Sequence, residues 1–494
     1  PCPHYDSCNV GRHGILCSQC QANFSLSIMS NKCLFSIECT PIKFWCFFIL
    51  SIIGHCLFLL CQCNIHKVFL FSKWLYASIK YLIPRFIRKT AAHSTQVRSA
   101  ECGSRKSTTA TLKNCSAEVS FSFMCQLFVY YIQDLSLLQV EKKFMAIQKI
   151  RIISFIQNWV KNILFASAIV PSDTCLPEMG IFGKVSITLC TSPIMVICLF
   201  VGLGTLCCLQ KRQMVRSWNS HIFLAILLSV MYSSQKITST LFSLIHCILI
   251  NKEKRLFVYA HAECWQIWQI FVLCYIATGT LPQCLIFLLG PQLLNSGKIT
   301  KWQFILGLFC PLPCMGHWLI LIFRNEKIRN NHPRCLSTLK ILDQIQNPFA
   351  EKKLSFWFCW TGVISVYRLV LVLCDQLMFN QVHSYFAKSV ICLLFLVLVA
   401  SLKPYKSEYL NISYAFGLFS QVLIGFFSSI YAMMNSALGH VIPSVLSILY
   451  VQQLLSILTP LILALSAVLF ALKIKMLGDL ESFIRKTSQI FNCL

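Results

Sequence analysis

Residues 410–434 read LNISYAFGLFSQVLIGFFSSIYAMM and contain no Asp, Glu, Lys or Arg. A helix of about 20 apolar residues, rising 1.5 Å per residue, crosses the hydrocarbon core of a bilayer. Nine other runs have a similar apolar character, near 43–63, 120–140, 185–208, 221–247, 264–290, 302–323, 355–377, 386–402 and 444–472. The sequence therefore predicts an all-α polytopic membrane protein.

The composition of the whole chain agrees with this class. Its 494 residues are 56% hydrophobic and 12% charged, whereas a soluble protein has roughly 25% charged residues. This excludes a large soluble enzyme, a coiled coil and a disordered chain. The net charge is +26, but the basic residues lie in short loops between apolar runs, as the positive-inside rule describes, so the lipid bilayer is expected as a partner and nucleic acid is not.

The stretch before the first run is rich in cysteine. Its six cysteines are Cys2, Cys8, Cys17, Cys20, Cys33 and Cys39. So short a stretch buries too little apolar surface to fold unaided, and the even count predicts a disulfide framework whose pairing stays open. Zinc at Cys17 and Cys20 is the alternative, but a second Cys-x-x-Cys or His pair is absent. Asn23 begins a glycosylation sequon, in agreement with an extracellular module.

The distribution of Lys and Arg argues against ten spans. With the cysteine-rich head outside, ten spans place 15 basic residues inside and 22 outside, against the positive-inside rule. If 120–140 does not cross, the division becomes 32 and 5; if 302–323 does not cross, it becomes 28 and 9. Pro311 and Pro313 interrupt the second run, which favours a re-entrant segment there. We therefore expect about nine transmembrane helices, with the N-terminus outside and the C-terminus inside.

This layout divides the chain into three parts. Residues 1–41 form the extracellular module, 42–472 the multi-pass domain with a basic cytoplasmic loop at 64–119, and 473–494 a cytoplasmic tail. Cys175 and Cys264 then lie outside, where they could pair with each other or with Cys247. The chain begins at Pro1 without a signal peptide, so we expect either processing or a longer parent product.

Polar and charged residues inside the apolar runs are the candidate site. Each charge costs roughly 2.5–3.5 kcal/mol at a helix centre, so it needs a partner or a hydrated cavity. Asp134 is the one acid deep in a run, and its candidate partners are Lys236 and Arg368. The polar patch around Lys236 also contains Ser233, Ser234, Gln235 and Thr240. Either a structural ion pair between helices or a hydrated path or ligand cavity would explain these groups.

The basic loop 64–119 contains a segment that mixes cations with aromatic and aliphatic residues. Its basic residues are Lys73, Lys80, Arg85, Arg88 and Lys89. Such a segment is able to lie in the membrane interface and attract anionic lipids. Control of topology without lipid specificity explains the same pattern equally well.

Several short motifs together resemble a known group of proteins. They are 14–20 (GILCSQC), 232–236 (YSSQK), 263–268 (ECWQIW), 367–369 (YRL) and 403–406 (KPYK). They resemble uncharacterised multi-pass surface proteins of molluscs, cnidarians and sponges with an EGF-like, cysteine-rich ectodomain. The overall plan of the chain, an outer domain followed by about nine helices, is similar to that of TRP-like membrane proteins. The resemblance implies the layout and a plasma-membrane location, and it implies no activity.

The motifs of common enzymes are missing from the sequence. There is no His-Glu-x-x-His, no phosphate loop ending in Gly-Lys-Ser/Thr and no Gly-x-Ser-x-Gly. We expect no enzyme, no cofactor and no metal, and intramembrane catalysis is the least favoured alternative. The favoured function is channel- or transporter-like permeation or sensing through the bundle. The alternative is a receptor or adhesion protein that binds an extracellular ligand through its head; the oligomeric state stays open.

Overall fold

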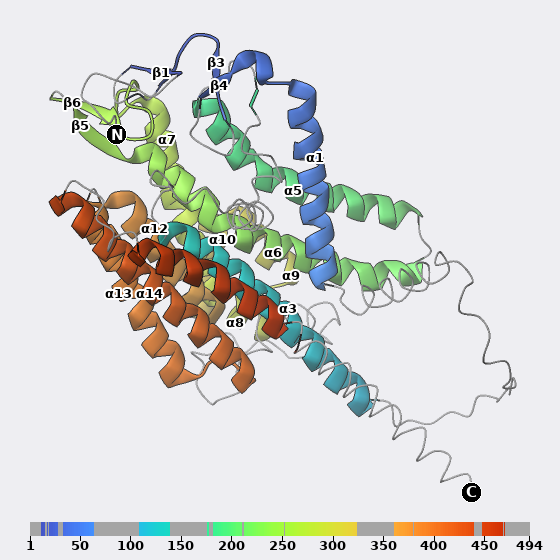
Figure 1. Cartoon of the computed structure of the whole chain (residues 1–494). Helices are drawn as coiled ribbons and strands as arrows, with labels where there is room; N and C mark the ends of the chain where they lie inside the picture. The colour runs from blue at the N-terminus through green and yellow to red at the C-terminus, as the bar shows by residue number, and fades with distance from the viewer. Residues whose placement is uncertain are drawn as a thin grey trace, which may run out of the picture.

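The computed structural model of the chain is mostly helical (Figure 1). The structure describes residues 11–14, 17, 19–27, 33–63, 108–138, 175–176, 181–209, 212–250, 252–323, 360–378, 380–438, 447–467 and 469. Within them, five helical segments are long and apolar enough to cross a membrane: Ile267–Leu294, Trp360–Leu377, Gln381–Leu402, Glu408–Ala437 and Ser447–Ala467. The described part of the chain is therefore that of a helical membrane protein.

The head contains two short antiparallel hairpins. Strand β1 (Arg12–His13) pairs with β2 (Gln19–Cys20), and β3 (Phe24–Leu26) pairs with β4 (Cys33–Phe35), which the 3-10 turn η2 (Ser36–Glu38) follows. The Cys20–Cys33 disulfide joins the two hairpins, and Asn23 lies exposed in the turn before β3.

The head is not cross-linked only to itself. Cys39 forms a disulfide with Cys175, 136 residues further along the chain, and Ser27 forms a β-bridge with the same Cys175. The prediction of a framework confined to the six head cysteines is wrong on this point, because the chain brings a distant loop against the head. Cys17 is also disulfide-bonded, while Cys2 and Cys8 lie outside the described residues. Cys17 and Cys20, both disulfide-bonded, cannot offer zinc the thiolates it needs.

A third hairpin lies beside the head (Figure 1). Strands β5 (Cys247–Ile250) and β6 (Glu253–Leu256) are antiparallel, and a Cys247–Cys264 disulfide closes the segment that contains them. The side-chain amide of Gln19 donates a hydrogen bond to the hydroxyl of Tyr259 (2.8 Å). The head, Cys175 and this hairpin thus gather at one end of the helices, which we call the head end.

Three long helices meet the head end. Helices α1 (Pro41–Cys63) and α5 (Ile181–Leu209) both begin there, and α6 (Arg212–Ile245) ends there at β5. An apolar cluster of α1 (Phe44, Phe48 and Ile52) packs against Ile187 and Ile194 of α5. Since both helices begin at the head end, they run in the same direction.

Helix α3 (Thr108–Leu138) lies at the centre of the bundle, and most side chains of its 123–138 half are buried. It runs parallel to α6, α12 (Trp360–Leu377) and α14 (Glu408–Leu438). Paired contacts along α14 establish that direction: Gly417 lies against Tyr131, and Gly425 lies against Leu138. The last eight positions of α3 therefore face several helices at once, and any polar side chain there needs a partner within the protein.

The remaining long helices run the other way. One continuous helical segment comprises α7 (Ile267–Tyr275), the π-helical η4 (Ile276–Thr280) and α8 (Leu281–Asn295), and it starts at the head end. Helix α13 (Gln381–Leu402) pairs with α12, and the last helix (Ser447–Ala467) pairs with α14. Two contacts along the last pair, Gln452–Ser428 and Thr459–Ser420, show that those helices are antiparallel.

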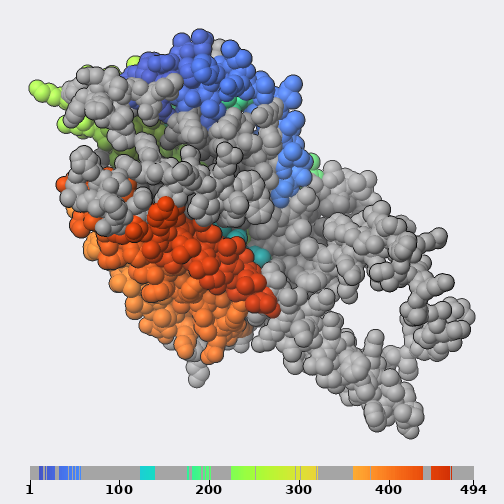
Figure 2. All heavy atoms as spheres, viewed as in Figure 1, coloured from blue at the N-terminus to red at the C-terminus, as the bar shows by residue number. Residues whose placement is uncertain are grey.

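The outer surface of these helices is apolar. In Figure 2 the orange and red atoms of α12, α13, α14 and the last helix form a continuous face. Large apolar side chains are exposed on these helices, among them Leu394, Val397, Ile412, Phe419 and Leu454. Soluble monomers rarely expose contiguous apolar surface on this scale, so these side chains indicate helix faces that contact lipid.

The run 302–323 is two helices rather than one. Helix α9 (Lys301–Phe309) ends at Cys310, and α10 (Pro311–Phe323) begins at the proline that cannot continue the α9 hydrogen-bond ladder. The rings of Phe304 and Trp318 stack with centroids 6.3 Å apart, although a straight helix would place these residues about 21 Å apart. The chain therefore reverses direction at this break.

Two helices extend beyond the predicted apolar runs. Helix α3 begins at Thr108, inside the predicted loop 64–119, and α6 begins at Arg212, ahead of the run near 221–247. Both helices extend beyond the apolar run because their first turns are polar, and hydropathy does not detect a polar helical turn. The lipid-binding candidates Lys73, Lys80, Arg85, Arg88 and Lys89 and the tail 473–494 lie outside the described residues.

Candidate functional site

A buried ion pair joins the central helix to α12. Nε of Arg368 lies 3.2 Å from Oδ1 of Asp134, and both side chains are almost completely buried. Of the two partners considered for Asp134, the structure places Arg368 there and leaves Lys236 on the exposed side of α6. The pair lies where α3, α6 and α12 meet.

Two glutamines complete the hydrogen bonding of this pair. The side-chain amide of Gln235 donates to Oδ1 of Asp134 (3.1 Å), and the amide of Gln133 donates to the carbonyl of Tyr232 (2.8 Å). Both side-chain oxygens accept from Nη2 of Arg368. A buried ion pair is tolerated when its remaining donors and acceptors are satisfied in this way. Gln133, Asp134, Gln235 and Arg368 are called the polar core below.

Aromatic residues surround the polar core. The guanidinium carbon of Arg368 lies 4.2 Å from the centroid of the Tyr130 ring, a cation–π geometry. The hydroxyl of Tyr367 donates to Oε1 of Gln421 on α14 (3.2 Å), and its ring stacks on Phe395 of α13 at 4.1 Å. The polar core is thus connected to α13 and α14 as well.

A small cavity borders the polar core on the side of α8. Its volume open to the centre of a water molecule is about 30 Å³, enough for roughly two waters. Its lining residues come from α3, α6, η4, α8 and α12: Tyr130, Met231, Ser234, Gln235, Thr238, Thr280, Gln283, Cys284, Phe287, Ile364, Ser365, Arg368, Leu369 and Val372. Asp134 is not among them.

The helix beside this cavity is irregular at the same level. Pro282 has no backbone N–H and therefore leaves the carbonyl four residues earlier without a helical donor. The turn before this proline, η4, is π-helical, and the backbone N–H of Leu281 donates to the carbonyl of Ile276. The hydroxyl of Thr278 donates to the carbonyl of Cys274 (2.7 Å). π-Helical turns occur frequently at functional sites. Thr280, in this turn, lines the cavity.

The other polar candidates of α6 have different surroundings. The hydroxyls of Ser233 and Ser234 donate to carbonyls of their own helix, those of Ser229 and Met231 (2.8 and 2.9 Å). The hydroxyl of Thr240 donates in the same way to the backbone carbonyl of Lys236 (2.8 Å). Only Ser234 and Gln235 of the patch line the cavity, and Lys236 does not. Only part of the patch therefore borders this cavity.

A second ion pair was missed in the sequence. Nζ of Lys388, a side chain with 1% of its area exposed, lies 2.7 Å from Oδ1 of Asp375 and donates to the carbonyl of Leu137 (2.6 Å). The hydroxyl of Ser428 donates to the next carbonyl, that of Leu138 (2.6 Å). These carbonyls end helix α3 and carry the negative end of its dipole. The sequence feature that could have predicted this ion pair is Lys388 itself, a cation inside the apolar run 386–402.

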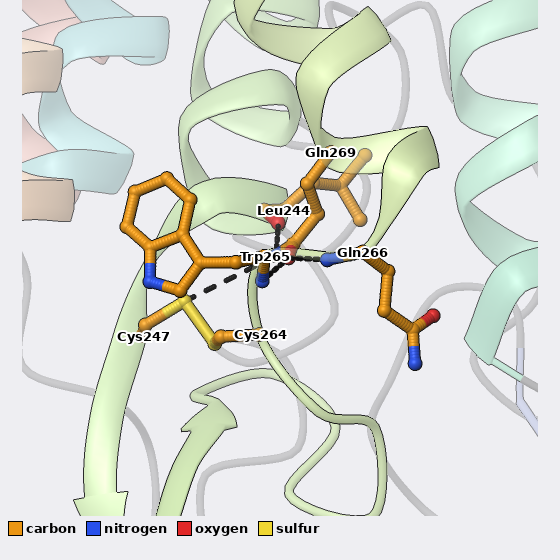
Figure 3. The surroundings of a disulfide bond; sticks show 6 residues. All are labelled: Leu244, Cys247, Cys264, Trp265, Gln266 and Gln269. Carbon is orange, nitrogen blue, oxygen red and sulfur yellow. Dashed lines mark hydrogen bonds between the residues drawn. A yellow bond between two sulfur atoms is a disulfide. The ribbon is translucent and has the colours of Figure 1, made fainter.

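The α6–α7 junction is held by a disulfide and a glutamine (Figure 3). Cys247 and Cys264 are bonded, which is one of the predicted pairings. The predicted pairings of Cys175 with these two cysteines are wrong, because Cys175 is bonded to Cys39. The buried side chain of Gln269 donates to the carbonyl of Leu244 (2.9 Å) and accepts from the backbone N–H of Trp265 and of Gln266. These contacts hold the end of α6 to the start of α7, so the head end and the bundle form one connected structure.

Comparison with known proteins gives no relative: no family model, no curated protein and no solved structure matches the chain. Among the described residues, no group of three or more His, Cys, Asp or Glu side chains is arranged to hold a metal ion.

Proposed function

We propose that nine helical segments cross the membrane, with the head outside and the C-terminus inside. The helix directions support this layout, because α1, α5, α7–α8, α13 and the last helix run away from the head end, while α3, α6, α12 and α14 run toward it. The reversal between α9 and α10 supports a re-entrant segment at 302–323. The division of 28 basic residues inside and 9 outside supports the same orientation.

An epitope tag at the C-terminus tests this layout on intact cells. We expect antibody staining only after permeabilisation, whereas a tag inserted in the hairpin after Ile250 should stain without it. Disulfide mapping should recover Cys20–Cys33, Cys39–Cys175 and Cys247–Cys264. Staining of the C-terminal tag on unpermeabilised cells would contradict the odd number of spans.

We propose further that the protein is channel- or transporter-like and that its bundle carries permeation or sensing. The observation that supports this most is the cavity between α6, α8 and α12, which combines buried Arg368, polar side chains and a π-helical turn. We assign this small cavity to a closed conformation. Opening would require movement of α7–α8 against α12, and the irregular turn gives that helix a site at which to bend.

Purified protein in liposomes tests permeation. We expect ion or solute flux across the membrane under at least one of voltage, stretch, pH or calcium. Ser365→Phe should fill the cavity and lower the flux at least tenfold. Ser436→Phe is the matched control, because the Ser436 hydroxyl also bonds to its own helix and lies exposed on α14. Tight liposomes with folded protein under all four stimuli would contradict the proposal.

A receptor that binds its ligand through the head is the second candidate. The Cys39–Cys175 disulfide and the Gln19–Tyr259 hydrogen bond favour it, since they connect the head to the starts of α5 and α7. A ligand that moved the head would therefore displace the helices directly. A binding screen has to use the whole chain, because residues 1–41 alone lack Cys175.

A further inference from the structure

The cavity beside the polar core is bordered by the positive member of the buried ion pair. Arg368 is the one charged residue that lines it among the described residues. Its partner Asp134 bonds to Nε and is not part of the lining. Because the positive group borders the cavity while its counterion lies behind it, the space should be favourable for negative charge, and the surrounding protein screens that field less than water would.

The other polar groups of the lining suit an anion of small size. Thr238 and Thr280, each with less than a tenth of its area exposed, are hydroxyl-bearing residues of the lining. Gln283 adds a side-chain amide, which also donates to the carbonyl of Leu308 (3.3 Å). Hydroxyl and amide groups are hydrogen-bond donors, as is the guanidinium. The volume of about 30 Å³ for water-sized centres has room for one or two small particles.

We propose that this cavity binds one small monovalent anion, such as a halide, nitrate or thiocyanate, between Arg368, Thr238 and Thr280. The proposal names the ligand class of the site used in the proposed function. It does not need the anion to cross the membrane, since a bound anion that holds α6, α8 and α12 together would occupy the same place.

Binding of radiolabelled iodide to the purified full-length protein tests this proposal. We expect saturable binding of about one iodide per chain. Chloride and nitrate should displace the iodide, whereas gluconate at equal ionic strength should not. Binding that does not saturate, or that gluconate displaces equally, would overturn the proposal.

Variants of the lining locate the bound ion. Thr280→Leu removes a hydroxyl and adds volume inside the cavity, so iodide affinity should fall at least tenfold, while Thr280→Ser should keep it within about twofold. Thr278→Leu is the control for the same chemical change two residues away, on the exposed side of the helix. Only variants whose melting temperature and gel-filtration elution volume match those of the parent protein are compared. Equal affinity in Thr280→Leu and Thr278→Leu would overturn the assignment to this cavity.

The outcomes separate this proposal from the proposed function. Iodide binding without flux in liposomes would support the anion site and contradict permeation. Flux without saturable binding would support permeation and contradict the anion site.

Discussion

Replacing Asp134 by asparagine should be the most damaging single change in the polar core. Removal of one partner of a buried ion pair costs about 3–5 kcal/mol, because the other charge is left uncompensated. Arg368 is almost completely buried, so bulk solvent does not replace the lost carboxylate. We expect a large fall in the melting temperature of purified Asp134→Asn and a low yield at the cell surface.

The double variant Asp134→Asn with Arg368→Gln provides the decisive comparison. Neutralising both groups removes the uncompensated charge, so the double variant should be more stable than either single variant and show a coupling free energy of about 2 kcal/mol or more. Lys254→Gln is the control, since it removes an exposed cation of the β5–β6 hairpin, outside the helices, and should change stability by less than about 0.5 kcal/mol. Additive effects in the double variant would show that the pair is not coupled.

Replacing Lys388 by methionine should have the second largest effect. The change removes the ammonium that contacts Asp375 and the Leu137 carbonyl at the end of α3. Asp375 is partly exposed, with 25% of its side-chain area open, so water recovers part of its loss. We expect a destabilisation of about 2 kcal/mol, which is the upper range for a cation at a partly buried helix C-terminus.

Thermal unfolding in detergent measures this effect. Adding Asp375→Asn to Lys388→Met should recover part of the stability, because the remaining unpaired carboxylate is then gone. Lys254→Met, an exposed lysine in the β5–β6 hairpin, should behave as the parent protein. A Lys388→Met variant as stable as the parent would show that α3 does not depend on this contact.

The apolar segments could be predicted from the sequence because the free energy of transferring a helix into lipid is nearly the sum of the contributions of its residues. The five long apolar helices coincide with predicted runs, and the break at 302–323 was visible in Pro311 and Pro313. The cost of a buried charge pointed in the same way to Asp134 and Arg368 as residues in need of partners. These transfer free energies depend on the composition and spacing of residues, both of which can be read from a sequence.

The choice among partners depended on the tertiary structure. Asp134 had two candidate cations, and only the rotation and packing of α3, α6 and α12 determined that Arg368 faces it while Lys236 faces outward. The Cys39–Cys175 disulfide joins residues 136 positions apart, and no local pattern relates them.

The sequence by itself determined the membrane class, the apolar helices and the residues that need burial partners, since each follows from local transfer free energies. Tertiary structure alone decided the rotation of each helix, and with it the ion pairs, the docking of the head and the cavity beside Arg368. The physical reason is that helix rotation and tilt are set by packing against neighbouring helices, and lipid is nearly indifferent to which apolar face it contacts.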